Sequence, residues 1–358
     1  MKWGIRMLPI EFREALLERV LTFLWRQWAA LGVLGESGAE DDWVIDPEPL
    51  LVFSLEIGRY EPRLFDEILA WLLVNGQWLD MARLKRILEK QDRKTVQIAG
   101  AAFQYVLSKG NKRKWQNITQ FCAGIYKKQS AADSIEPLFR EKSGKPHPLA
   151  IGDKVEPNFL LFSMNRPKIN IQKEAKEVPV NASANLRFLL RSIFGIGAKS
   201  ESLLYLLTHE GARPREIADA VGLFWLGIHQ TLLDLSRSGL VLTRSRGRKV
   251  EYWVSHRKWW DFLASLNIDE ASPPKWLNWI AVFSALSVAW KAVDEMAFGT
   301  ESDYMKSSRL QDSLEIIAQE FSRSGHDIPR IPTMGLPPDL HQKTALIFLG
   351  NIFGVAHE

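Results

Sequence analysis

The segment from residue 199 to residue 254 constrains the fold more than any other part of the chain. Its apolar side chains recur every three or four residues in three successive stretches, and this spacing predicts three helices. Pro214 opens the second stretch, and Gly222-Leu223 separates it from the third, as expected for a tight turn between helices. Two strand-like stretches, 240–244 and 250–254, follow and are joined by a cationic loop. The predicted order is therefore helix, helix, turn, helix and hairpin.

The third predicted helix, 225–237, carries Ile228, Leu232 and Leu235 on one buried face. Together with the sequence REIADAVGL at 215–223 and the basic hairpin, this pattern resembles the winged helix-turn-helix domain of bacterial ArsR-like and MarR-like regulators. The resemblance extends over this segment and no further. It implies a transcription regulator whose third helix enters the major groove of double-stranded DNA and whose hairpin contacts the neighbouring backbone. It also implies a homodimer on a two-fold site.

Nine side chains in this segment are candidates for DNA contacts. Cationic side chains suit the phosphate oxygens, the Gln230 amide can pair with adenine, and His229 can reach a base or a phosphate. Trp225 shares the outward face of the third helix with these two residues. The candidates are Arg213, Arg215, Trp225, His229, Gln230, Arg244, Arg246, Arg248 and Lys249.

The start of the third helix suggests an alternative. It has the sequence Phe224-Trp225-Leu226-Gly227, which offers few hydrogen-bond donors for reading bases. An exposed pair formed by Phe224 and Trp225 can instead dock another protein. The rival hypothesis is thus a non-catalytic protein-interaction module, such as an antitoxin-like adaptor.

Charge is distributed unevenly along the chain. Residues 1–82 contain 7 basic and 14 acidic side chains, whereas residues 83–145 contain 15 basic and 5 acidic ones. The basic stretch predicts either a second nucleic-acid surface or a helical surface that faces the acidic N-terminal part of the same chain. The residues of the possible second surface are Lys112, Arg113, Lys114, Lys127 and Lys128.

The remaining pattern predicts a mainly α fold, in which a helical N-terminal domain and a helical C-terminal domain flank the winged helix with its small β-hairpin. A basic three-helix run at 62–107 forms a second helix-turn-helix-like candidate. The apolar window 276–290 has 15 residues, too short for a membrane span, and is expected to be a buried core helix. The expected divisions are an N-terminal domain at 1–141, a proline-containing connecting segment at 142–185, the winged helix at 186–256 and the C-terminal domain at 257–358.

Residue types that carry out catalysis show no suitable spacing. The seven histidines form no ligand pair, and a single cysteine, Cys122, offers neither a disulfide nor a thiolate cluster. We therefore expect no enzymatic activity, no metal and no cofactor. The N-terminus lacks the apolar region of a signal peptide, so we expect a cytoplasmic protein without a membrane partner.

Overall fold

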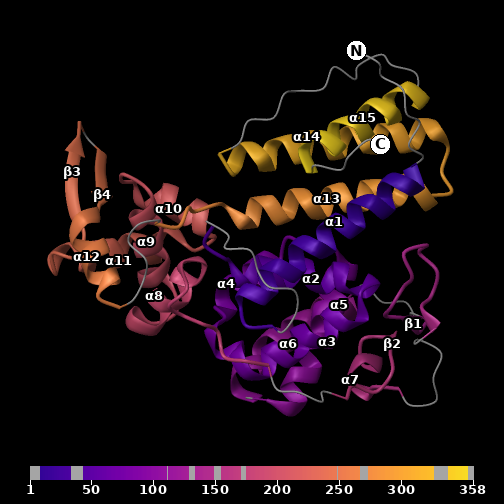
Figure 1. The fold of residues 1–358 in the computed structure, drawn as a ribbon, viewed down its shortest axis with the longest axis horizontal. Helices are drawn as coiled ribbons and strands as arrows, with labels where there is room; N and C mark the ends of the chain where they lie inside the picture. The colour runs from indigo at the N-terminus through magenta and orange to yellow at the C-terminus, as the bar shows by residue number, and fades with distance from the viewer. Residues whose placement is uncertain are drawn as a thin grey trace.

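The computed structural model confirms a mainly helical fold with a small antiparallel two-stranded sheet. Figure 1 shows two parts: a large body built from helices of both ends of the chain, and a smaller unit at one side that carries the hairpin. No helix among the described residues is long and apolar enough to cross a membrane. The structure describes residues 9–33, 43–110, 112–128, 134–148, 155–170, 175–247, 249–266, 273–325 and 338–353.

The first part of the body is a stack of helices whose starts are set by side-chain caps. The Asp80 carboxylate accepts hydrogen bonds from the backbone N–H groups of Ala82 and Arg83, and Asp92 accepts one from Thr95, as Asp does at helix N-termini. These helices are α1 (Pro9–Ala30), α2 (Pro47–Ile57), α3 (Pro62–Asn75), α4 (Met81–Leu88), α5 (Arg93–Lys109) and α6 (Lys112–Lys128).

Helix α5 shows that the second helix-turn-helix prediction, at 62–107, is wrong. Its residues from Thr95 to Phe103 are all buried, and the helix packs against α2, α3, α6 and α7. A helix enclosed on all sides cannot enter a DNA groove. The basic start of α5 thus belongs to the helical body and leaves the 199–254 segment as the helix-turn-helix candidate.

The proline-containing connecting segment, 142–185, packs against the body. Phe159 and Phe162 are buried. The segment contains α7 (Pro157–Leu160) and β2 (Met164–Asn165). Strand β2 pairs in parallel with β1 (Glu136–Pro137), which lies just before the segment in the chain.

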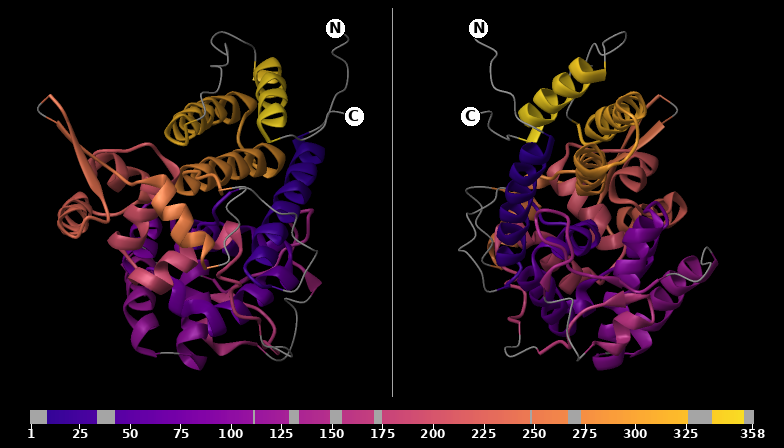
Figure 2. Two further views of the ribbon diagram at one scale, coloured as in Figure 1. Left: turned by 60° about the vertical axis from the view of Figure 1, so that its left-hand side comes forward. Right: turned by 90° about the vertical axis from the view of Figure 1, so that its right-hand side faces the viewer.

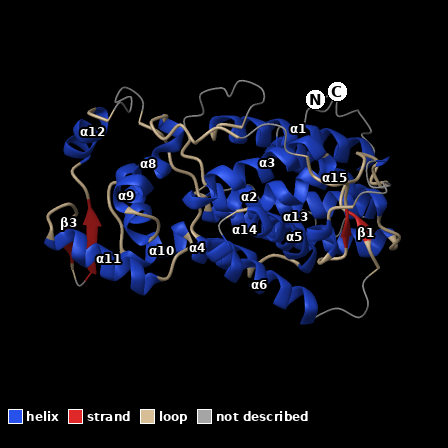
Figure 3. Ribbon diagram, turned by 90° about the horizontal axis from the view of Figure 1, so that it is seen from below, coloured by secondary structure: helices blue, strands red, loops and turns tan. Residues whose placement is uncertain are grey.

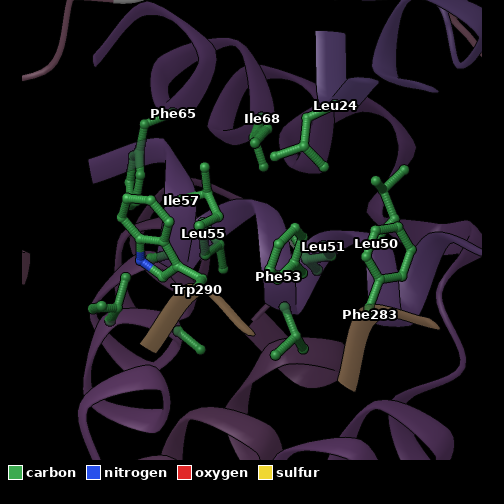
Figure 4. Packing of buried hydrophobic residues seen from close by; sticks show 14 of the residues in the cluster. Leu24, Leu50, Leu51, Phe53, Leu55, Ile57, Phe65, Ile68, Phe283 and Trp290 are labelled. Carbon is green, nitrogen blue, oxygen red and sulfur yellow. The ribbon is translucent and has the colours of Figure 1, made fainter. Parts of the chain in front are cut away.

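The C-terminal helices complete the same hydrophobic core. Figure 4 shows Phe283 and Trp290 of α13 packed among Leu50 and Phe53 of α2 and their neighbours. The prediction of a buried helix at 276–290 is confirmed. One hydrophobic cluster therefore unites both ends of the chain, so the predicted domain divisions do not coincide with the cores. The C-terminal helices are α13 (Trp279–Phe298), α14 (Asp303–Arg323) and α15 (Pro338–Phe353).

The smaller unit, which we call the α8–α12 unit, has a hydrophobic cluster of its own. Its hairpin stands away from the rest of the molecule in Figure 2. Gly197 precedes the first residue of α9, and the hydroxyl of Ser200, which lies inside that helix, donates to the Gly197 carbonyl. The unit contains α8 (Leu186–Phe194), α9 (Ala198–Thr208), α10 (Pro214–Val221), α11 (Trp225–Arg237), β3 (Leu242–Arg246), β4 (Lys249–Trp253) and α12 (His256–Ala264).

A buried ionic network joins the α8–α12 unit to the body. Arg191 of α8 contacts Glu48 of α2 and Glu201 of α9, with N–O distances of 2.7 Å to each. Arg83 of α4 contacts Glu48 at 2.6 Å, and its Nε donates to the carbonyl of Val221 at 2.6 Å. Three cations and three anions, each at most 3% exposed, are thus sealed at the junction. The network consists of Asp46, Glu48, Arg83, Arg187, Arg191 and Glu201.

The arginines keep the buried carboxylates charged. Burial by itself would raise the pKa of Glu48, but the positive charges of Arg191 and Arg83 outweigh burial and hold the pKa of Glu48 far below its ordinary value. The pKa of Glu201 is lowered in the same way, because Arg187 and Arg191 overcome the opposing effect of burial. The junction is therefore an ionised cluster that holds the α8–α12 unit in one orientation on the body.

Candidate nucleic-acid interface

The turn between α10 and α11 has the geometry that the sequence predicts. Gly222 adopts a left-handed conformation, with φ of +72°, and its N–H donates to the Ala218 carbonyl. Glycine accepts this conformation at little cost, which explains its position between the helices. On α11, Ile228, Leu232 and Leu235 are buried, and this predicted face is confirmed.

The opposite face of α11 is open to solvent. The Trp225 side chain is 55% exposed, and its ring lies 5.9 Å from the half-buried ring of His229. Gln230 is exposed and donates from Nε2 to the carboxylate of Asp234 at 3.2 Å. Of the three predicted contact residues on α11, Trp225 and Gln230 are thus accessible, and His229 is accessible in part.

An apolar tip occupies the start of this face. Phe224, Trp225 and Leu226 are 70%, 55% and 64% exposed. The guanidinium of Arg86, on α4, lies 4.0 Å from the centre of the Phe224 ring. Leu226 and Arg86 are not among the predicted interface residues. No local sequence pattern indicates that Arg86 contacts the ring of Phe224, which lies far from it in the chain.

The hairpin differs from its prediction in the position of its strands and the length of its turn. Both strands have five residues, as predicted, but β3 begins two residues later and β4 one residue earlier than predicted. Arg244 lies in β3, and its Nε contacts the carboxylate of Glu251 at 2.9 Å from the facing position on β4. The register also pairs Arg246 with Lys249, so Gly247 belongs to a shorter turn than the predicted 245–249 loop. The sequence missed this because the strand pairing, which extends to Arg246 and Lys249, cannot be derived from alternation alone.

The cations of the hairpin therefore fall into distinct groups. Arg244 is exposed but paired with a carboxylate, whereas Lys249 is exposed at the start of β4. The side chain of Arg246 and the whole of Arg248 lie outside the described part of the structure. Lys249 is thus the predicted hairpin cation whose accessibility the described residues establish.

The two predicted arginines near α10 also differ. Arg213 caps the helix and donates from Nε to the Glu216 carboxylate at 2.7 Å, a contact that raises the pKa of Arg213. Arg215 is exposed on the first turn of α10. Arg213 is therefore engaged within its own helix, and Arg215 is accessible.

Helix α6 carries the second predicted basic surface. Arg113 is exposed, while Lys114 is half-buried and donates from Nζ to the Gln77 carbonyl at 2.5 Å. Burial lowers the pKa of Lys114 to about 8, so this side chain loses its proton, and with it its positive charge, more readily than an exposed lysine does. The predicted residues whose side chains lie outside the described part of the structure are Lys112, Lys127 and Lys128.

Two cations of the basic stretch, Arg83 and Lys142, follow the intramolecular alternative, and Lys142 contacts the Glu18 carboxylate at 2.6 Å. Arg83 is 1% exposed and contacts Asp46 and Glu48, which belong to the acidic N-terminal part. Lys85, on the same helix, is instead exposed, and its Nζ lies 4.9 Å from the centre of the Phe121 ring of α6. The basic stretch is thus divided between a buried junction and a solvent surface.

Comparison with known proteins gives no guide to this arrangement, since no protein-family model, curated protein or solved structure matches the chain. Among the described residues, no three His, Cys, Asp or Glu side chains gather closely enough to hold a metal ion.

Proposed function

We propose that the α8–α12 unit is a winged helix-turn-helix that binds duplex DNA, with α11 as the recognition helix and the β3–β4 hairpin as the wing, and that the protein regulates transcription. The observation that carries the proposal is the open face of α11 beside a hairpin that stands clear of the body (Figure 1). A helix of this kind fits the major groove, and a projecting hairpin reaches the flanking phosphates.

The side chains present suit this role in different ways. The Gln230 amide offers donor and acceptor groups for adenine, and Lys249 and Arg215 supply charge for phosphates. Trp225 and Leu226 can contact the methyl group of thymine, which is the apolar feature of the major groove. The proposal includes no catalytic step, metal or cofactor.

The test measures binding of the full chain to mixed-sequence duplexes of about 30 bp, three helical turns, by fluorescence anisotropy at several salt concentrations. The variant Lys249→Gln is expected to reduce the slope of log affinity against log salt by about 0.9, the value for one lost phosphate contact. Lys306→Gln makes the same chemical change on α14 of the body; it is the control and leaves the slope unchanged. An unchanged slope for Lys249→Gln would remove the hairpin from the proposed interface.

The apolar tip supports a second candidate, protein docking by Phe224, Trp225 and Leu226. Three adjacent large apolar side chains that are more than half exposed are typical of an interaction site. Substituting Ser for Phe224 and Trp225 together separates the two hypotheses. DNA affinity that stays intact while a co-purifying protein is lost favours docking, whereas a loss of DNA affinity with no change in co-purifying proteins favours the recognition-helix role.

A further inference from the structure

We infer that the DNA-binding face continues beyond the α8–α12 unit onto the body, across exposed side chains of α4 and α6, so that one duplex contacts both. This inference rests on the proposed function. It concerns a surface we call the α4–α6 ridge, which consists of the exposed side chains Lys85, Arg113, Gln116, Asn117 and Gln120 and the half-buried Arg86.

The first argument is that α4 touches the start of the proposed recognition helix. Arg86 places its guanidinium 4.0 Å from the Phe224 ring centre, and Arg83 donates to the last carbonyl of α10, that of Val221. The ridge therefore begins where the open face of α11 begins. Because the buried ionic network holds the junction, the two surfaces keep a fixed relation to each other.

The second argument is continuity along the molecule. Figure 3 shows α11, α10, α4 and α6 following one another along one edge. Helices α4 and α6 are in contact, and Lys85 reaches from one toward Phe121 on the other. A duplex lying on α11 along this edge meets the ridge without any domain movement.

The third argument is chemical. Helix α6 has no acidic residue between Lys112 and Lys128, and its exposed positions carry a guanidinium and three side-chain amides. Within the described residues, neither Lys85 nor Arg113 forms an ion pair with a carboxylate. Cations and amides without nearby anions are the groups that proteins use to contact phosphates. Exposed carboxylates do occur beside these helices, at Glu89 just after the end of α4 and at Asp219 on α10.

The length of the ridge determines how long a duplex must be to gain affinity from it. Helix α6 has 17 residues and is about 25 Å long, comparable with roughly seven base pairs of duplex. A DNA fragment limited to one helical turn can fill the α11 face alone, while a longer fragment also covers the ridge. Affinity should thus rise with duplex length in a way that depends on ridge charge.

The experiment compares the full chain with the double variant Lys85→Gln/Arg113→Gln on duplexes of about 10 bp and about 30 bp, one and three helical turns. On the longer duplex the variant should lower the salt slope by about 2, which corresponds to two lost phosphate contacts. On the shorter duplex it should behave as the unmodified chain. The charge-conserving variant Lys85→Arg/Arg113→Lys should keep the full slope on both.

The outcomes separate this inference from the function on which it rests. If the unmodified chain binds neither duplex, the proposed function fails. If it binds both and Lys249→Gln lowers the slope while the ridge variant does not, the proposed function stands and the ridge is overturned. An equal reduction of the slope by the control Lys306→Gln would also overturn the ridge, because the effect would then follow net charge instead of position.

Discussion

The buried ionic network provides the most direct test of how the two parts of the molecule are joined. Glu48→Gln keeps the shape of the side chain and removes its charge, which leaves two carboxylates among three guanidiniums. Arg191 contacts both carboxylate oxygens of Glu48, at 2.7 and 3.0 Å, and both side chains are fully buried. Removing one partner of such a pair typically costs about 3–5 kcal/mol, because a buried charge loses its compensation.

The assay is urea denaturation followed by circular dichroism, with a matched control at an exposed pair. Glu18→Gln makes the same chemical change at the contact between Glu18 and Lys142, where the N–O distance is 2.6 Å and both side chains are at least half exposed. Solvent screening limits the expected loss in the control to about 1 kcal/mol or less. The network variant should therefore lose several times more free energy of unfolding than the control.

A double-mutant cycle checks that the loss arises from the pair itself. Adding Arg191→Met to Glu48→Gln should cost at least about 1 kcal/mol less than the sum of the two single changes, since contacting residues are not additive. Equal losses for Glu48→Gln and Glu18→Gln would refute the reasoning, because burial of the network would then contribute nothing.

Three further predictions concern the body and the junction. Gly100→Ala should destabilise by about 1–3 kcal/mol, because the added Cβ meets Phe162 and Cys122 at less than 3.0 Å, whereas Gly124→Ala on the open side of α6 should stabilise by up to about 1 kcal/mol; thermal denaturation of both variants tests the opposite signs. Burial raises the pKa of the Cys122 thiol to about 12, so iodoacetamide at pH 8 should modify the unfolded chain and spare the native one, as mass spectrometry can show. The free energy of unfolding should fall as the pH drops below the ordinary glutamate pKa of 4.5. In this range Glu48 and Glu201 bind protons in the unfolded state, whereas in the native state they stay ionised because their pKa values are lower. A free energy of unfolding that stays constant down to pH 3 would contradict this.

Local patterns predicted the elements whose determinants lie close together in sequence. The bounds 225–237 for α11 agree with the structure, since its apolar spacing, Gly222 and the following turn are all local signals. The caps at Asp80 and Asp92 were equally accessible to prediction, because a cap bonds to N–H groups two or three residues away.

The features that escaped prediction depend on distant partners. Arg191 and Glu48 are 143 positions apart, and the charge count, which includes Glu48 in the acidic N-terminal part, does not show that its side chain lies in the interior. The strand register places Arg244 opposite Glu251, so its guanidinium is paired with a carboxylate. Net charge and periodicity contain no information about either arrangement, so the sequence predicted the helices and strands of the candidate interface but not which of its cations pair with carboxylates.

The shared core of the two chain ends also has a consequence during synthesis. Helices α1 and α2 leave the ribosome long before α13, whose Phe283 and Trp290 cover them in the finished protein. At translation rates of about 5–20 residues per second, that apolar surface stays uncovered for about 10–45 s before α13 has been synthesised. The α8–α12 unit, with a cluster formed almost wholly by its own helices, can be complete by then. The large body therefore exposes apolar surface for longer during synthesis than the α8–α12 unit does.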